Sequence, residues 1–216
     1  MDEKLMKHIE LLVERYPSLE SAKDSIIEAY SLMEESYGRG GKLLICGNGG
    51  SAADAEHIAG ELMKGFKLPR KVDKAFADKL TAADPGLGAV LAENLQGALP
   101  AIALDGHPAL TTAYMNDCEP LLCFAQQVNG FGRDGDVLLG ISTSGNSQNV
   151  LYAAAAARAK GMKVIGLTGE RDSRLSAFAD VCVKAPSQET YMIQELHLPV
   201  YHCWCLMLED RFFGAE

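Results

Sequence analysis

Residues 43–57 read LLICGNGGSAADAEH, and this stretch decides the fold class of the chain. The apolar run Leu43–Cys46 leads into a glycine-rich segment, Gly47–Ser51. An alanine-rich stretch that favours helix follows, from Ala52 to about Phe66. The order predicts a short buried strand, a tight glycine turn and a helix.

The same order of elements recurs in the second half of the chain. The apolar run 136–141 precedes a loop of hydroxyl side chains at 142–147, and an alanine-rich helical stretch follows to Ala159. Gly161 is predicted to cap the C-terminus of that helix. Further short strands are expected at 101–104, 164–167 and 181–183. Alternating strands and helices predict a doubly wound, flavodoxin-like parallel sheet with helices on both faces.

The length of 216 residues suits a single α/β domain spanning 1–216. Two amphipathic helices are expected within residues 1–37, one in the first fifteen residues and one from Ser18 to the glycines that begin at Gly38. The segment 67–98 separates the first ligand motif from the next strand. We expect it to be an extra insertion with one or two helices and a turn near Pro85.

The formal net charge of −9 disfavours non-specific binding to nucleic acid or to an anionic membrane surface. The N-terminus is charged and lacks the apolar core of a secretory signal, and no later stretch has the length and hydropathy of a transmembrane helix. The six cysteines are scattered without paired spacings, which favours reduced thiols and a cytoplasmic location. Cys203 and Cys205 are two residues apart, so they point to different sides of a helix and are interpreted as core residues.

The loop 142–147 combines four hydroxyl side chains with the free N–H groups of a helix start. That combination suits a phosphate group. An ordinary Ser/Thr-rich helix cap is the alternative interpretation. The turn Gly47–Ser51 is equally ambiguous, because glycines allow both close approach to a ligand and a simple tight turn. It has neither the dinucleotide fingerprint nor the P-loop lysine.

His57 and Glu61 are four residues apart on a predicted helix and share one face, so they can serve one metal or one reaction. A solvated pair is the alternative. Near the C-terminus, Gln194 and His202 are eight residues apart, about 80° around an ideal helix. His197 is predicted to be a buried histidine with a backbone partner. Pro199 is expected either to start a helix or to kink one.

Three motifs occur in order along the chain: Gly47–His57, Gly140–Ser147 and Ile193–His197. Together they resemble the SIS-domain sugar-isomerase family, and within it the branch that isomerises sedoheptulose 7-phosphate. The resemblance covers nearly the whole chain except 67–98, which is longer than the family's usual link.

The resemblance implies a homotetramer with active sites where subunits meet, no nucleotide cofactor and a sugar phosphate as ligand. It implies one zinc ion per subunit, held by His57, Glu61, Gln194 and His202, with Glu61 and His202 as the catalytic acid/base pair. The positions that match substrate contacts are Asn48, Gly49, Gly50, Ser51, Glu61, Asn116, Asp117, Ser142, Thr143, Ser144, Ser147 and Gln194.

An aldose–ketose isomerisation needs a base that moves a proton between C1 and C2, and a partner for the oxygen protons. The longer segment 67–98 leaves a different phosphosugar open as the substrate, because it could cover the sugar end of the pocket. A non-catalytic relative that binds a replication initiator or senses a phosphosugar is the other alternative. Glu61 and His202 favour catalysis over both non-catalytic roles.

Overall fold

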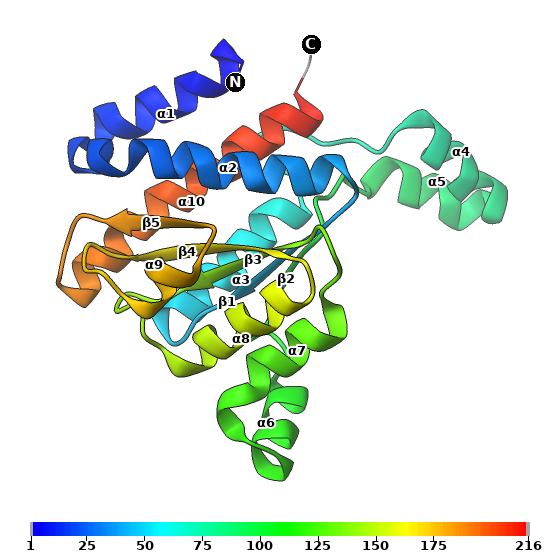
Figure 1. Cartoon of the computed structure of the whole chain (residues 1–216). Helices are drawn as coiled ribbons and strands as arrows, with labels where there is room; N and C mark the ends of the chain where they lie inside the picture. Colours follow the sequence, from blue (N-terminus) through cyan, green and yellow to red (C-terminus); the bar gives the residue numbers. More distant parts are fainter. Residues whose placement is uncertain (1, 215–216) are drawn as a thin grey trace.

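Five parallel strands form the centre of the structure, a computed structural model that describes residues 2–214. Their order in the sheet is β2-β1-β3-β4-β5 (Figure 1). This is the flavodoxin-like order, and it confirms the doubly wound parallel sheet expected from the sequence. The strands are β1 Leu43–Cys46, β2 Ala101–Ala103, β3 Val137–Ile141, β4 Lys163–Gly169 and β5 Val181–Ala185.

Neighbouring strands β1 and β3 bring the two ligand motifs together. Leu43 pairs with Val137, and the register runs on to Cys46 beside Gly140 at the carboxyl ends of the strands. The glycine turn therefore leaves β1 at the same edge where the hydroxyl loop leaves β3. In such sheets the strand order reverses at this point, and ligands bind in the crevice outside it.

Alternate strand residues face two separate helical layers. Leu43 and Ile45 pack against α1 Glu3–Arg15, α2 Lys23–Gly38, α3 Gly50–Met63 and α10 Thr190–Phe213. Leu44 and Cys46 pack on the opposite face, against α7 Cys123–Phe131, α8 Gln148–Ala159 and α9 Arg174–Phe178. The sheet is therefore buried on both faces, which explains its continuous apolar strands.

Several boundaries differ from the expected ones. Residues 17–22 form a 3₁₀ helix, η1 Pro17–Ala22, so α2 begins at Lys23 rather than near Ser18. Gly161 has a φ of 76° directly after α8, as expected of a glycine at the end of a helix. Four elements that the sequence did not predict are α6 Pro108–Asp117, η2 Pro120–Leu122, α7 and α9. No residue of α6 is buried, so the sequence there has no apolar stripe.

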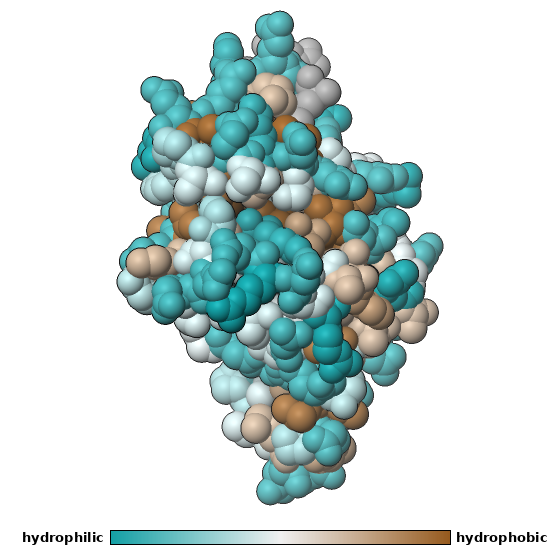
Figure 2. Space-filling view, turned by 60° about the vertical axis from the view of Figure 1, so that its left-hand side comes forward, coloured by the Kyte–Doolittle hydropathy of each residue, from teal (hydrophilic) through white to brown (hydrophobic). Residues whose placement is uncertain are grey.

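The face of the molecule shown in Figure 2 is mostly hydrophilic, but apolar residues gather in places on it. Figure 2 shows hydrophobic residues grouped in a band between hydrophilic regions of the face that it presents. Within residues 2–214, no helix has the length and apolar character needed to cross a membrane. Exposed large apolar side chains include Leu11, Met63, Phe76, Leu87, Val90, Leu110, Met115, Leu121 and Leu198.

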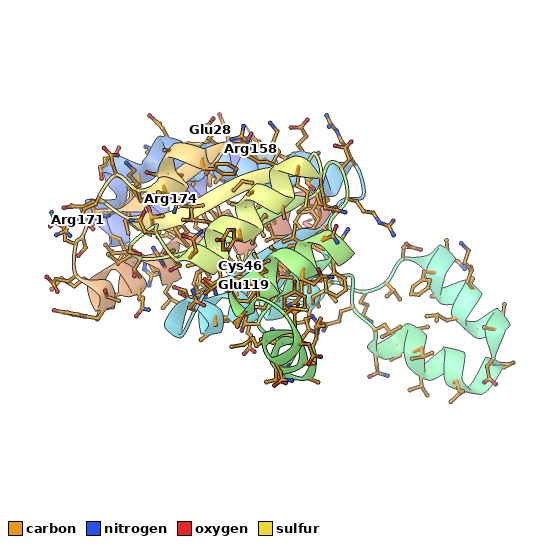
Figure 3. All side chains as sticks on the ribbon, turned by 60° about the horizontal axis from the view of Figure 1, so that its bottom comes forward. Glu28, Cys46, Glu119, Arg158, Arg171 and Arg174 are labelled. Carbon is orange, nitrogen blue, oxygen red and sulfur yellow. The ribbon has the colours of Figure 1, made fainter. Side chains whose placement is uncertain are left out.

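Two helices in the segment 67–98 form a hairpin that projects from the body of the protein (Figures 1 and 3). They are α4 Lys74–Ala83 and α5 Pro85–Asn94. Asp73 caps α4 and Asp84 caps α5, each through a side-chain oxygen that accepts a backbone N–H. Lys71 pairs with Gln96 and closes the base of the hairpin.

The base of this hairpin lies at the amino edge of the sheet. Leu99 N donates to Leu62 O at the end of α3, and β2 then begins at Ala101. The ligand motifs leave the sheet at its carboxyl edge. The hairpin therefore does not cover the ligand loops of its own chain, and the expectation that segment 67–98 covers the sugar end of the pocket stays a prediction.

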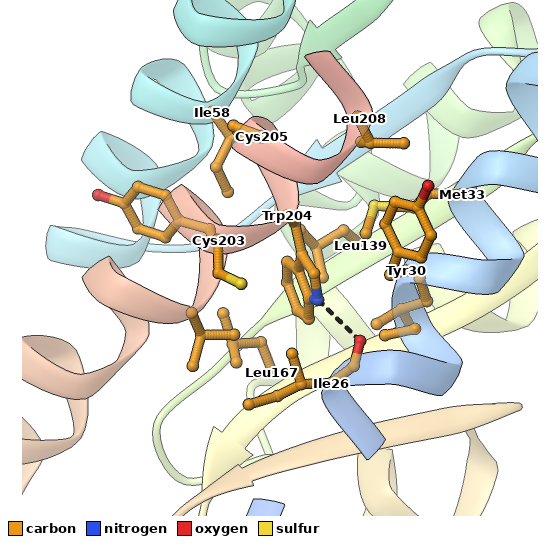
Figure 4. Close-up of a cluster of buried hydrophobic side chains, with 14 of the residues drawn as sticks. Ile26, Tyr30, Met33, Ile58, Leu139, Leu167, Cys203, Trp204, Cys205 and Leu208 are labelled. Atoms are coloured by element: carbon orange, nitrogen blue, oxygen red, sulfur yellow. Dashed lines mark hydrogen bonds between the residues drawn. The ribbon is translucent and has the colours of Figure 1, made fainter. Parts of the chain in front are cut away.

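The core beneath α2 and α10 is built around Trp204 (Figure 4). Its indole Nε1 donates to the backbone carbonyl of Ile26 at 2.9 Å, which ties α10 to α2. Cys203 and Cys205 are both buried and unpaired beside it, as expected for core residues. This packing fixes the face of α10 that lies against α3.

Candidate active site

The hydroxyl loop between β3 and α8 is folded as an open anion cradle rather than as a capped helix start. Ser147 occupies the N-cap position of α8, but its side chain makes no capping hydrogen bond. Its Oγ lies 3.0 Å from Oγ of Ser142 instead. Gly145 turns the loop with a φ of 63°. The loop hydroxyls and the N–H groups of the first two residues of α8 can therefore contact one phosphate, whereas the third, that of Val150, already donates to Asn149 Oδ1.

The glycine turn after β1 is held against this loop. The amides of Asn48 and Asn149 exchange two hydrogen bonds, of 3.0 and 2.8 Å, which join the turn to α8. Gly49 has a φ of 58°. Ser51 is buried at the start of α3, and Gly50 lies against the side-chain amide of Gln194. A Cβ at residue 50 would meet that amide, so the Gln194 side chain would have to move to accommodate it.

Two hollows flank the paired loops. One, of about 290 Å³, lies beside Thr143 and Ser144 and also contains Arg171 and Gln188. The guanidinium of Arg171 donates to the side-chain oxygen of Gln188 and places a positive charge near the loop. The other, of about 320 Å³, is lined by Asn48, Gly49, Asp105, Thr111 and Asn149. A polar ligand can therefore contact the loops from either side.

Asn116 and Asp117 do not join the ligand loops in this structure. They lie at the end of α6, are exposed, and make a hydrogen bond of 2.9 Å from the Asn116 amide to the Asp117 carboxylate. Met115 on the same helix lines the hollow beside Asn48. Their role in substrate binding stays a prediction.

A second group of predicted site residues lies where α3 packs on α10. Nε2 of His57 is 3.5 Å from Oε1 of Glu61. The rings of His57 and His202 have centroids 5.0 Å apart at an angle of 89°. Helix α10 runs through Pro199 without ending, so the alternative in which a helix starts at Pro199 is wrong. His202 lies beside His57 despite the proline.

Gln194 does not lie with these three side chains. It contacts Gly50 near the start of α3, whereas His202 is eight residues further along α10, about 12 Å along an ideal helix axis. Within residues 2–214, no three His, Cys, Asp or Glu side chains are arranged closely enough to hold a metal ion. One chain thus places His57 beside both Glu61 and His202, but the three side chains are not arranged as a metal site.

The chemistry of the three grouped side chains nevertheless fits a divalent metal ion. Nε2 of His202 is buried and has no hydrogen-bond partner in the structure. Burial, followed by the neighbouring His57, lowers the pKa of His202 below its ordinary 6.5. A neutral imidazole with a free lone pair can accept a proton or bind zinc.

His197 has the structural role that the sequence predicted for it. It is fully buried, and its Nε2 lies 3.2 Å from the carbonyl oxygen of Thr168 on β4. Burial lowers its pKa to about 4. This histidine is therefore neutral near pH 7 and fastens α10 to the sheet.

Sequence reasoning gave no role to Asp54, although it lies in the first motif. The structure places its carboxylate 3.2 Å from the hydroxyl of Tyr201, which in turn contacts His57. The only signal in the sequence was the polar pair Tyr201–His202 within an apolar stretch. The link across to Asp54 depends on the packing of α3 on α10.

Comparisons with known proteins place this chain in a family. A family model described as SIS domain matches residues 8–95 and 89–169. The chain is 41% identical over 188 residues to a phosphoheptose isomerase from Thiobacillus denitrificans, covering 86% of this chain and 82% of that protein. Two solved phosphoheptose isomerases are also similar. The one from Neisseria gonorrhoeae has a TM-score of 0.70 and 32% identity, covering 96% of this chain and 98% of that chain. The one from Francisella tularensis has a TM-score of 0.74 and 31% identity, covering 96% and 97%.

Proposed function

Because this chain belongs to the phosphoheptose isomerases of the SIS-domain family, we propose that it interconverts sedoheptulose 7-phosphate and an aldose, a heptose 7-phosphate, through an ene-diol intermediate. The observation that carries the proposal is the grouping of Glu61 with His57 and His202 in a chain that also has an open phosphate loop. The family membership confirms the resemblance seen in the three motifs.

Each group has a distinct task in the proposed reaction. The hydroxyls of Ser142, Thr143, Ser144 and Ser147 and the first N–H groups of α8 hold the phosphate. Glu61 transfers the proton between C1 and C2 of the sugar. His202 exchanges protons with the sugar oxygens, for which its neutral imidazole is suited.

The active site is proposed to be shared between subunits of a homotetramer. Glu61 is eleven residues beyond Gly50 on α3, about 16 Å along an ideal helix axis, so the phosphate loop and the base of one chain are far apart. The side chain of His57 is 42% exposed, which leaves room for another subunit to approach it. The exposed apolar side chains supply surface for such contacts.

Zinc is the proposed metal, with His57, Glu61 and His202 as ligands from one chain. Gln194 lies too far along α10 to join them within that chain, so its amide would come from another copy. When bound, the ion would stabilise negative charge on the ene-diolate oxygens. Because a metal-bound carboxylate is a weaker base, Glu61 can serve as ligand or as base but not fully as both.

The protein is also proposed to act in the cytoplasm. All six cysteines are unpaired in the structure, and the buried ones lie in the two cores. Such thiols suit a reducing compartment.

The direct test is incubation of the protein with sedoheptulose 7-phosphate, followed by detection of the aldose product. The assay is run after chelation and again with added zinc, and beside a panel of other ketose phosphates. Preferential turnover of the seven-carbon substrate is expected. Faster turnover of a shorter ketose phosphate would reassign the substrate, and binding without any turnover would favour a sensing role.

A further inference from the structure

The hydroxyl of Tyr201 bridges two residues of α3. It lies 3.2 Å from Oδ1 of Asp54 and 3.0 Å from Nδ1 of His57. The rings of Tyr201 and His57 meet edge to face, with centroids 5.5 Å apart at 77°. The three side chains therefore form one continuous chain of hydrogen bonds that ends at His57.

This chain is held in place by packing. Tyr201 is 1% exposed and belongs to the main core beside Trp204. Oδ2 of Asp54 is buried and has no hydrogen-bond partner in the structure. The Asp54 carboxylate is therefore directed at the tyrosine hydroxyl, with no competing protein donor on its second oxygen.

With Asp54 ionised, counting protons sets the direction of these bonds. A tyrosine hydroxyl has one proton, and a carboxylate can only accept. If the hydroxyl donates to Asp54, its oxygen must accept from the Nδ1–H of His57. The neutral imidazole then has its lone pair on Nε2, the nitrogen that faces Glu61 at 3.5 Å.

We propose that Tyr201 and Asp54 are positioning residues that hold His57 as the Nδ1–H tautomer and direct the Nε2 lone pair into the active site. The arrangement places two acceptors, Nε2 of His57 and a Glu61 oxygen, opposite each other. Two such acceptors are stable together when a proton or a cation lies between them. The proposal that zinc binds to this lone pair rests on the proposed function. The assignment of the Nδ1–H tautomer to His57 does not.

The tautomer is measured by ¹⁵N NMR of the histidine side chains in the metal-free protein. The wild-type His57 is expected to carry its proton on Nδ1. Asp54→Leu removes the acceptor, so the Tyr201 hydroxyl becomes free to donate to Nδ1, and the His57 proton should move to Nε2. A wild-type His57 with its proton on Nε2 and none on Nδ1 would overturn the proposal.

Metal affinity gives a second measurement that does not depend on turnover. Tyr201→Phe should weaken zinc binding about 10–100-fold, as loss of a hydrogen bond that orients a ligand commonly does. Tyr37→Phe is the matched control, because it removes another buried hydroxyl, bonded to Pro100 O at 3.2 Å, away from the site. Equal zinc affinity in Tyr201→Phe and Tyr37→Phe would contradict the proposal.

The two proposals fail in different ways. If the wild-type protein binds no zinc and turns over no ketose phosphate, the proposed function is wrong. The tautomer of His57 can still be measured by NMR in that case. If turnover is present and the proton lies on Nε2, the isomerase activity stands and the positioning role of Tyr201 is wrong.

Discussion

Nε of Arg70 lies 2.7 Å from Oε1 of Glu209, and both side chains are almost completely buried. The same guanidinium donates to the carbonyl oxygens of Leu62 at 2.7 Å and Glu61 at 3.0 Å, the last turn of α3. Glu209 on α10 also accepts the backbone N–H groups of residues 66–68. The pair thus fastens the end of the helix that carries Glu61.

Removing one partner of this pair should destabilise the protein strongly. Arg70→Met leaves the Glu209 carboxylate buried without its cation, and we expect a loss of about 3–5 kcal/mol in the free energy of unfolding. Urea denaturation measures it. Lys74→Ala is the control, because it breaks an exposed pair with Asp78 and should change stability by at most about 1 kcal/mol. Similar losses of unfolding free energy in both variants would show that the buried Arg70–Glu209 pair stabilises the protein no more than an exposed pair does.

Acid should weaken the fold through Glu209. Burial opposes its ionisation, but the N–H groups of Phe66 and Lys67 and then the Arg70 guanidinium outweigh burial and lower its pKa below the ordinary 4.5. A carboxyl whose folded pKa is depressed contributes its stability above the ordinary value and loses it as pH falls towards the folded pKa. The free energy of unfolding should therefore drop below about pH 4.5.

The matched variant for this pH dependence is Glu209→Gln. It should be less stable than the wild-type protein near neutral pH and should show a shallower decline in acid, because the titrating group is gone. An unchanged pH profile would mean that other carboxyl groups dominate acid unfolding.

The sheet and its ligand motifs were predictable because their signals are local. The apolar run Leu43–Cys46 has the same bounds in the structure, since glycines end it abruptly. The pair Arg70–Glu209 was not predictable, because its members are 139 residues apart and look like ordinary surface charges in sequence. Helix α6 was missed because no residue of it is buried.

The role of Glu61 as the catalytic base is tested by the substitution Glu61→Gln. The amide keeps the shape of the side chain but cannot take a proton, so kcat should fall about 10²–10⁴-fold with a smaller change in KM. Glu56→Gln makes the same chemical change at an exposed position of the same helix and should retain activity. Kinetics with sedoheptulose 7-phosphate compare the two. Equal activity in both variants would remove Glu61 from the mechanism.

The phosphate loop is tested at Gly145. Alanine there would be strained at a φ of 63°, and its Cβ would clash with Ser173. Backbone strain of this kind costs about 1–3 kcal/mol. We expect at least a several-fold rise in KM for the sugar phosphate, measured by initial rates.

The control for the loop is Gly130→Ala. Gly130 lies in α7, has ordinary φ and has nothing within 4 Å of an added Cβ, so KM should stay unchanged. An unchanged KM in Gly145→Ala as well would contradict a phosphate-binding role for the loop.

The site was less predictable than the sheet. Motif order placed His57, Glu61 and His202 in one group, and they lie together. It also placed Gln194 there, but spacing along α10 separates Gln194 from the others within one chain. A sequence records which side chains are present, whereas the distances between them depend on how the helices pack.

The closed base of the α4–α5 hairpin has an evolutionary consequence. Because Lys71 and Gln96 already lie side by side, the chain between them can lengthen or shorten without moving either end. Doubling the length of a flexible loop costs only about 0.6 kcal/mol in closure entropy. Natural selection can therefore remodel the outer part of this hairpin, whereas its base, where Arg70 donates to the carbonyl oxygen of Glu61, is constrained together with the site.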